Sequence, residues 1–224
     1  MAETENGEGL LARTRRKLVA TKERWAREGR LLTGRPSRPE SQRLPPGQRQ
    51  VQDWPVLDLG IQPDVSAERW QLTIDGLVEN PVTWDWVAFR AQPAFRSVSD
   101  IHCVTAWSRF DNPWEGVSAR HALAVVRPKP EARFIVFHSY DDYTTNLPLA
   151  DFDAADALLA HSWQGRPLPR EHGGPVRAVV PKLYFWKSAK WLRRIEFVAE
   201  DRRGFWEERG YHDHGDPWSE ERYG

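Results

Sequence analysis

The sequence of 224 residues predicts a single α+β domain in which strands outnumber helices. Segments rich in Val, Ile, Phe and Tyr recur between residues 69 and 200, and Pro, Gly or charged residues bound them. Helical signals are fewer and do not alternate one for one with these segments, which argues against a doubly wound parallel sheet. The length suits one compact domain and is too short for two ordinary domains with linkers.

The expected elements follow one another along the chain. The first strand-like segment, residues 69–78, contains a Gly near its end, and a turn at Asn80–Pro81 then leads into a short strand or helix. Ser118 has the residue type of a helix N-cap before residues 119–126. Further strand-like segments lie at residues 95–99, 131–140, 176–180 and 192–200, and a second helical pattern lies at residues 150–163.

The equal numbers of acidic and basic residues hide a division of charge. Residues 1–50 contain twelve Lys and Arg against six Asp and Glu, whereas residues 51–224 contain twenty against twenty-six. We therefore expect residues 1–50 to form a basic arm and linker, and residues 51–224 to form the domain. The arm is either solvated or docks on an acidic partner. Nucleic acid is a poor partner for it, because the arm lacks interleaved aromatic residues and the domain is acidic.

Within the arm, a weak helical pattern precedes an extended stretch. Apolar residues recur every seven positions, but one apolar line is narrower than the stripe of a core-facing helix. Residues 34–50 are rich in Pro, Gly and polar residues, which is typical of a linker. The residues of the apolar line are Leu11, Leu18, Trp25 and Leu32.

Several classes of protein are excluded or disfavoured by composition. The chain has no uninterrupted apolar run of about 18 residues, so we expect no membrane insertion. No apolar stretch follows the paired arginines near the start, so we expect no export signal and a cytoplasmic location. The single cysteine excludes an intrachain disulfide and any site built from several thiolates.

A strongly basic segment lies inside the acidic domain. Residues 166–194 contain eight Lys and Arg and only one acidic residue, Glu171. Converging Arg and Lys side chains bind phosphate oxygens well, so the segment is a candidate anion site. The alternative is a scatter of solvated surface cations. Aromatic residues interleave with these cations, which places some of their aliphatic stems close to the core.

Cys103 has three interpretations from the residues alone. It is a buried inert thiol, a catalytic thiolate or a metal ligand. A catalytic thiolate needs a base, and the linear sequence does not choose among the histidines. The candidate bases are His102, His121, His138 and His172.

Three motifs resemble the sulfite oxidase family in order and approximate spacing. They are HCVTAWSRFDNPWEG, FHSYDDYTTNLPL and EHGGPVRAVVPKLYFWKSAKWLRRIEF, and the likeness extends over residues 51–224. It implies the molybdopterin-binding fold of that family and a molybdenum–molybdopterin cofactor. The CVTAWS segment is closer to bacterial single-domain members, such as the catalytic subunit of protein-methionine-sulfoxide reductase, than to sulfite oxidase itself.

The resemblance assigns roles to individual residues. It implies that Cys103 is the molybdenum ligand, a soft donor that suits this metal. It implies that His172 and Arg177 hold the pterin and its phosphate, and that a short turn closes around the phosphate. The residues of that turn are Ser188, Ala189 and Lys190.

Further residues are expected near the open face of the metal. Tyr143 and Asn146 are candidate catalytic residues in a loop that also contains Thr144 and Thr145, and His138 is placed with the cofactor-binding residues. The remaining candidates have alternative roles in packing or at the surface. They are Trp107 and Trp114, which wall the site or pack in the core, and Tyr211 and His212, which approach the site or lie exposed.

The resemblance implies a molybdenum-dependent oxidoreductase that transfers an oxygen atom to or from a small S-oxide or N-oxide. The substrate-binding arginines of sulfite oxidases do not transfer residue by residue onto AWSRFDNP, which contains Arg109. Electrons are expected to pass to or from a separate redox protein. The alternatives are oxidation of sulfite or another sulfur oxyanion, a pterin- or phosphate-binding module without turnover, and a metal-free interaction protein.

Overall fold

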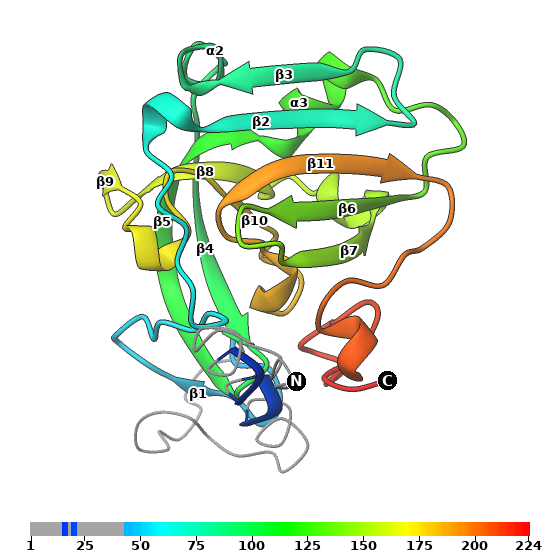
Figure 1. The fold of residues 1–224 in the computed structure, drawn as a ribbon. Coiled ribbons are helices and arrows are strands. Elements are labelled where there is room, and N and C mark those ends of the chain that lie inside the picture. The colour runs from blue at the N-terminus through cyan, green and yellow to red at the C-terminus, as the bar shows by residue number, and fades with distance from the viewer. Residues whose placement is uncertain (1–14, 18, 22–42) are drawn as a thin grey trace, which may run out of the picture.

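The computed structural model describes residues 15–17, 19–21 and 43–224 of the chain. Within the arm, residues 15–17 and 19–21 are helical. The four residues of the predicted apolar line, Leu11, Leu18, Trp25 and Leu32, lie outside the described residues. The domain is built from two sheets (Figure 1), which confirms the strand-rich α+β prediction.

The first sheet contains the long hairpin that carries Cys103. Four of its strands follow the order β1-β5-β8-β10, β4 pairs with β5, and β9 pairs with β8. β1 runs parallel to β5, and the other pairs are antiparallel. The strands are β1 (Arg49–Gln50), β4 (Phe95–Cys103), β5 (Trp107–Ser118), β8 (Leu158–Trp163), β9 (Arg166–Pro167) and β10 (Arg177–Val179).

The second sheet has the order β3-β2-β11-β6-β7. β2 and β11 are parallel, and its other pairs are antiparallel. Side chains alternate along β2, where Leu72 and Ile74 point into the core and their neighbours face outward. The strands are β2 (Gln71–Gly76), β3 (Val82–Asp85), β6 (Phe134–Ser139), β7 (Thr144–Pro148) and β11 (Leu192–Val198).

Short helices connect the strands. Asp85 and Ser118 cap two of them by accepting hydrogen bonds from the N–H groups of Ala88 (2.8 Å) and His121 (3.1 Å), the second as predicted. None of the described helices is long and apolar enough to cross a membrane. The α-helices are α2 (Trp86–Arg90), α3 (Ala119–Val126) and α4 (Leu149–Phe152), and the 3-10 helices are η1 (Ala67–Arg69), η2 (Arg170–His172), η3 (Phe185–Lys187) and η4 (Glu207–Arg209).

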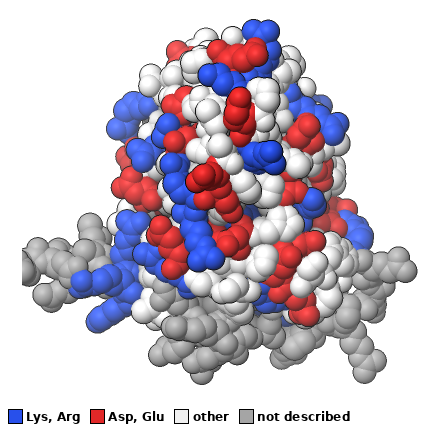
Figure 2. All heavy atoms as spheres, turned by 90° about the vertical axis from the view of Figure 1, so that its right-hand side faces the viewer, with Lys and Arg blue, Asp and Glu red and all other residues white. Residues whose placement is uncertain are grey.

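Two hydrophobic clusters hold the fold together. The larger cluster joins residues of both sheets, among them Leu72, Phe137 and Leu159. The smaller cluster surrounds the Cys103 end of the hairpin and includes Trp107 and Tyr184. The outer surface carries acidic and basic side chains that are interspersed on the face shown in Figure 2.

The structure differs from the sequence-based expectations in three segments. The predicted helix at residues 150–163 is wrong for its second half, because residues 158–163 form β8 between β5 and β10. A strand covered on both faces has an apolar run that resembles a buried helix. The expected loop at residues 144–148 is β7. Residues 49–50, placed in the linker by the sequence, form β1 and pair with β5.

Candidate active site

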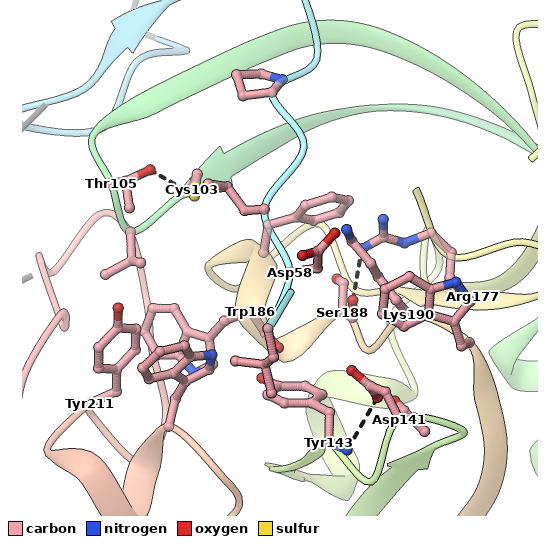
Figure 3. Close-up of a pocket in the computed structure, with 18 of the residues that line it drawn as sticks. Asp58, Cys103, Thr105, Asp141, Tyr143, Arg177, Trp186, Ser188, Lys190 and Tyr211 are labelled. Atoms are coloured by element: carbon pink, nitrogen blue, oxygen red, sulfur yellow. Dashed lines mark hydrogen bonds between the residues drawn. The ribbon is translucent and has the colours of Figure 1, made fainter. Parts of the chain in front are cut away.

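Cys103 opens onto a cavity of about 870 Å³, counted out to its open mouth (Figure 3). Six parts of the chain line it: residues 54–59, residues 103–107 at the Cys103 turn, residues 139–143, Arg177, residues 185–191 and the C-terminal residues Trp206 and Tyr211. Aromatic side chains predominate on its walls. They are Trp54, Trp107, Tyr143, Phe185, Trp186, Trp191, Trp206 and Tyr211.

The turn between β4 and β5 positions the thiol. Cys103 is the last residue of β4, and its carbonyl oxygen accepts hydrogen bonds from the N–H of Ala106 (3.0 Å) and the side chain of Gln48 (3.0 Å). Ala106 closes the three-residue loop with a φ of 66°, in the left-handed region that such hairpin loops use. The sulfur lies 3.2 Å from the Thr105 hydroxyl, so a polar neighbour faces the thiol inside the cavity.

Arg177 is a buried positive charge at the other end of the cavity. It is 1% exposed, and its guanidinium donates to the carbonyl oxygens of His172 (2.8 Å), Ser188 (2.7 Å) and Ala178 (3.2 Å). Burial lowers the pKa of Arg177 to about 9, which leaves it cationic at neutral pH. The structure shows no carboxylate bonded to it among the described residues. A buried charge without a counter-charge suits an anionic ligand.

The eight cations of residues 166–194 lie in different environments. Arg177 and Lys190 line the cavity, whereas Arg166 is exposed. The remaining five form ion pairs with carboxylates, so the segment is not one converging cluster. These five are Arg170, Lys182, Lys187, Arg193 and Arg194.

The turn at residues 188–190 closes this end of the cavity. The Ser188 hydroxyl accepts the N–H of Val180 (2.9 Å), and the Lys190 ammonium donates to the Glu171 carbonyl oxygen (2.6 Å). Gly173 has a φ of 103°, and a Cβ added there would lie 2.9 Å from Cβ of Lys190. Gly173 is therefore required by the close approach of the Lys190 main chain. Ala189 is buried in the larger cluster and does not line the cavity.

His172 lies behind the cavity wall. Its ring stacks on Trp54 with centroids 3.8 Å apart, and Trp54 rather than His172 lines the cavity. Burial, with the nearby Arg177 and Lys190, lowers the pKa of His172 to about 3, so the ring is neutral. Its buried Nδ1 has no hydrogen-bond partner among the described residues. Sequence reasoning missed Trp54, which stands alone between Asp and Pro with no periodic signal.

Two more predicted site residues, besides Ala189 and His172, lie outside the cavity lining. His138 pairs instead with Glu196 (Nε2 to Oε2, 2.9 Å), because successive side chains of β6 point to opposite faces. Its neighbour Ser139 lines the cavity in its place. The side chain of Asn146 is buried, and it donates to Asp201 (2.6 Å) and accepts from Lys187 (3.0 Å). Neither His138 nor Asn146 is therefore among the residues that line the cavity.

Of the other candidate residues, some line the cavity and some do not. Tyr143 lines the cavity, and its hydroxyl donates to the Trp186 carbonyl oxygen (2.7 Å). Burial raises the pKa of Tyr143 well above its usual value, so the phenol keeps its proton. Trp107 and Tyr211 also line the cavity. Trp114, Thr144, Thr145, Arg109 and His212 are not among the lining residues.

Unpaired polar atoms in the cavity wall indicate that it is built for a polar ligand. Nε1 of Trp107 and Oγ of Ser139 are buried and have no partner within the described part of the chain. Buried donors of this kind are normally bonded. A group that offers oxygen or nitrogen acceptors to them, a phosphate to Arg177 and a metal to the thiol of Cys103 fits this set of donors.

Comparison with known proteins agrees with this chemistry. Residues 59–206 match the family model described as the oxidoreductase molybdopterin binding domain. The chain belongs to this family. The sequence-based predictions of a sulfite oxidase-type oxidoreductase fold and of a molybdenum–molybdopterin cofactor are thereby confirmed. The donor set described above fits that cofactor.

Relatives place the chain within the molybdopterin-binding family. It is 46% identical over 185 residues to an uncharacterized oxidoreductase, YuiH, of Bacillus subtilis, covering 82% of this chain and 93% of that protein. It is 31% identical over 153 residues to the protein-methionine-sulfoxide reductase catalytic subunit MsrP of Ralstonia nicotianae, covering 61% of this chain and 46% of that subunit. The match therefore spans about half of the reductase subunit.

A solved structure shares the fold of the family. The sulfane dehydrogenase SoxCD from Paracoccus pantotrophus matches with a TM-score of 0.57 and 22% identity. The match covers 62% of this chain and 40% of that chain. At this identity the likeness concerns the fold alone.

Proposed function

We propose that this oxidoreductase reduces small uncharged S-oxides or N-oxides with electrons from a separate redox protein. One observation carries the proposal: the cations of the cavity lie away from the thiol. Figure 3 places Cys103 and Thr105 at one end, and Arg177 and Lys190 at the other. An oxyanion bound beside Cys103 has no lysine or arginine of the cavity lining next to it.

Different residues of the cavity would hold different parts of the cofactor. Cys103 would supply a thiolate to the metal, and Arg177 and Lys190 would bind the phosphate. Trp107 and Ser139 would donate hydrogen bonds to the pterin. When bound, the cofactor supplies a two-electron centre that exchanges an oxygen atom with the substrate. The protein fixes this group and surrounds the substrate with apolar walls that exclude water.

The proposed reaction balances with two electrons and two protons. A sulfoxide, two electrons and two protons give a thioether and water, and an N-oxide gives an amine in the same way. The protein-methionine-sulfoxide reductase subunits among the relatives support the reductive direction. The electron donor, the substrate and the cytoplasmic location stay predictions.

A substrate panel tests the proposal. The protein is purified from a host that makes the cofactor, and its molybdenum and pterin contents are measured. Aryl and alkyl sulfoxides and N-oxides are then assayed with a reduced dye, and sulfite is assayed with an artificial acceptor. We expect turnover of the neutral oxides at least tenfold faster than that of sulfite.

Two results would contradict the proposal. Faster turnover of sulfite would assign the cavity to a sulfur oxyanion. A molybdenum-to-protein ratio near zero, with no pterin released on denaturation, would mean that the chain is not a molybdenum enzyme.

A further inference from the structure

Three aromatic side chains contribute to one wall of the cavity; Figure 3 shows two of them, Trp186 and Tyr211, on the side that contains Cys103. Trp186 comes from η3, and the other two, Trp206 and Tyr211, flank η4. Trp206 and Tyr211 are stacked with centroids 4.9 Å apart, and Tyr211 meets Trp186 edge-on at 5.1 Å. We call these three residues the aromatic wall.

One buried carboxylate connects the separate parts of the aromatic wall. Glu207 follows Trp206 directly, and its Oε1 accepts hydrogen bonds from Trp186 Nε1 (2.8 Å) and the Thr145 hydroxyl (2.8 Å). The same oxygen lies 2.7 Å from the Lys187 ammonium, and both side chains are 0% exposed. Glu207 therefore joins η4, η3 and β7 at a single atom.

Lys187 extends the connection to the rest of the C-terminal segment. Its ammonium donates to the main-chain oxygen (2.9 Å) and side-chain oxygen (3.0 Å) of Asn146 on β7, and to the carbonyl oxygen of Asp213. The segment that carries Trp206 and Tyr211 is thus fastened to the second sheet on both sides of Tyr211.

A buried ion pair is a weak source of stability, because removal of both charges from water offsets most of their attraction. Its hydrogen bonds, in contrast, have a strict geometry. Neither Lys187 nor Glu207 lines the cavity, so the pair affects a ligand through the lining residues around it, among them those of the aromatic wall.

We propose that the Lys187–Glu207 pair positions the aromatic wall and thereby sets a preference for oxides that carry an aryl or other flat apolar group. Flat rings stack well on indole and phenol rings. This inference rests on the proposed oxide reduction, and it names the class of substrate that the same cavity accepts. Glu207 is a positioning residue, since it holds the aromatic wall and does not itself line the cavity.

The first test compares two Glu→Gln variants of the cofactor-loaded enzyme. Glu207→Gln removes the charge with little change of size, and Glu196→Gln is its control, because Glu196 pairs with His138 and Arg202 and does not line the cavity. Values of kcat and KM are measured for methyl phenyl sulfoxide and dimethyl sulfoxide. For Glu207→Gln we expect the preference for the aryl substrate to fall at least fivefold through KM, with kcat for dimethyl sulfoxide within twofold and molybdenum content unchanged.

Glu196→Gln is expected to leave the preference unchanged. An unchanged preference in Glu207→Gln, or an equal loss for both sulfoxides, overturns the inference.

A second test needs no turnover, so it separates this inference from the proposed function. Binding of thioanisole, the thioether product of the aryl substrate, is followed by quenching of tryptophan fluorescence. We expect Glu207→Gln to weaken binding at least fivefold. Thr145→Val removes one hydrogen bond to Glu207 Oε1 without a change of charge. We expect it to weaken thioanisole binding as well, by a smaller factor. This variant provides the measurement if Glu207→Gln does not fold.

The outcomes of this second test are distinct. If the unaltered enzyme reduces no oxide but binds thioanisole through the aromatic wall, the proposed function fails and the positioning role stands. If the unaltered enzyme does not bind thioanisole, or if the variants that fold bind it as tightly, the positioning role is refuted.

Discussion

Arg177 is a positive charge in a buried position, with a side chain that is only 1% exposed. Its three hydrogen bonds go to carbonyl oxygens, which orient the guanidinium but do not neutralise it. Phe185 packs against it at 4.1 Å from the ring centroid. An anion at this position supplies the missing charge, and the free energy of binding that anion offsets the cost of the buried cation.

Arg177→Gln is expected to lower the molybdenum and pterin contents of the purified protein at least fivefold, because a charge-assisted contact to phosphate is lost. Arg166→Gln is the matched control, since Arg166 lies in the same basic segment but is exposed. Metal analysis and pterin fluorescence provide the measurement. Full cofactor content in Arg177→Gln would refute the assignment of this residue to the phosphate.

Cys103→Ser is expected to reduce oxide turnover below about 1% of the unaltered enzyme, because a serine hydroxyl is a poor replacement for a soft thiolate. Pterin content is expected to remain above half, since the phosphate end of the cavity is unchanged. The control is Thr105→Val, which removes the neighbouring hydroxyl and keeps the thiol. Activity retained by Cys103→Ser would show that the cysteine has another role.

Among the elements, two turns with positive φ angles, at Gly173 and Trp191, shape the Arg177 end of the cavity. Gly173 terminates η2 with a positive φ, and Lys190 packs directly over its Cα. Trp191 adopts a φ of 47° next to Lys190, and its N–H donates to the Gly173 carbonyl oxygen (3.2 Å). The two turns therefore fix each other, and a side chain on Gly173 displaces both.

Gly173→Ala is expected to lower cofactor content several-fold, because the new Cβ pushes Lys190 away from the cavity. Gly165→Ala is its control: Gly165 also has a positive φ, 71°, but nothing lies within 4 Å of an added Cβ. Both changes carry the cost of a left-handed residue, about 1–2 kcal/mol. Equal cofactor contents in the two variants would mean that the contact with Lys190 is unimportant.

The elements also show how much the sequence alone can predict. Three strands could be predicted from the sequence pattern, because each has one buried and one outward face or is bounded by clear turns. They are the strands at residues 71–76, 134–139 and 192–198. β8 is buried on both sides, and its apolar run lacks the alternation that distinguishes a strand from a helix.

Prediction of the cavity had similar limits. Local motifs supplied residues that meet there, among them Cys103, Arg177 and Lys190. The choice between His138 and Ser139 depends on which face of β6 meets the cavity, and this requires the packing of the two sheets. Trp54 reaches the cavity through the path of the chain before β2, which no local pattern specifies.

At the scale of the whole molecule, folding buries three histidines in their neutral form. Burial is the largest cause in each case, and it lowers the pKa of His102 and of His161 to about 4 and that of His172 to about 3. On unfolding, each histidine regains an ordinary pKa of about 6.5. The folded state therefore binds fewer protons than the unfolded state below pH 6.5, so stability is complete above that pH and falls as the pH is lowered toward 4.

We expect the free energy of unfolding to fall between pH 6.5 and 5 by up to about 1.4 kcal/mol per pH unit for each of these histidines. Urea unfolding at pH 7.5 and 5.5 measures the change. His102→Gln is expected to reduce the pH dependence by about a third, and His212→Gln, at a half-buried position outside this group of three, serves as the comparison. An identical pH dependence in His102→Gln and the unaltered protein would contradict this prediction.

The turn that carries Cys103 is held by residues from both ends of the described chain. Gln48 donates to the Cys103 carbonyl oxygen (3.0 Å), and Arg222 donates to the carbonyl oxygens of Val104 (2.6 Å) and Pro46 (3.3 Å). The geometry around the thiol therefore depends on contacts between segments that are far apart in the sequence, so the Cys103 turn reaches its final shape only in the folded domain.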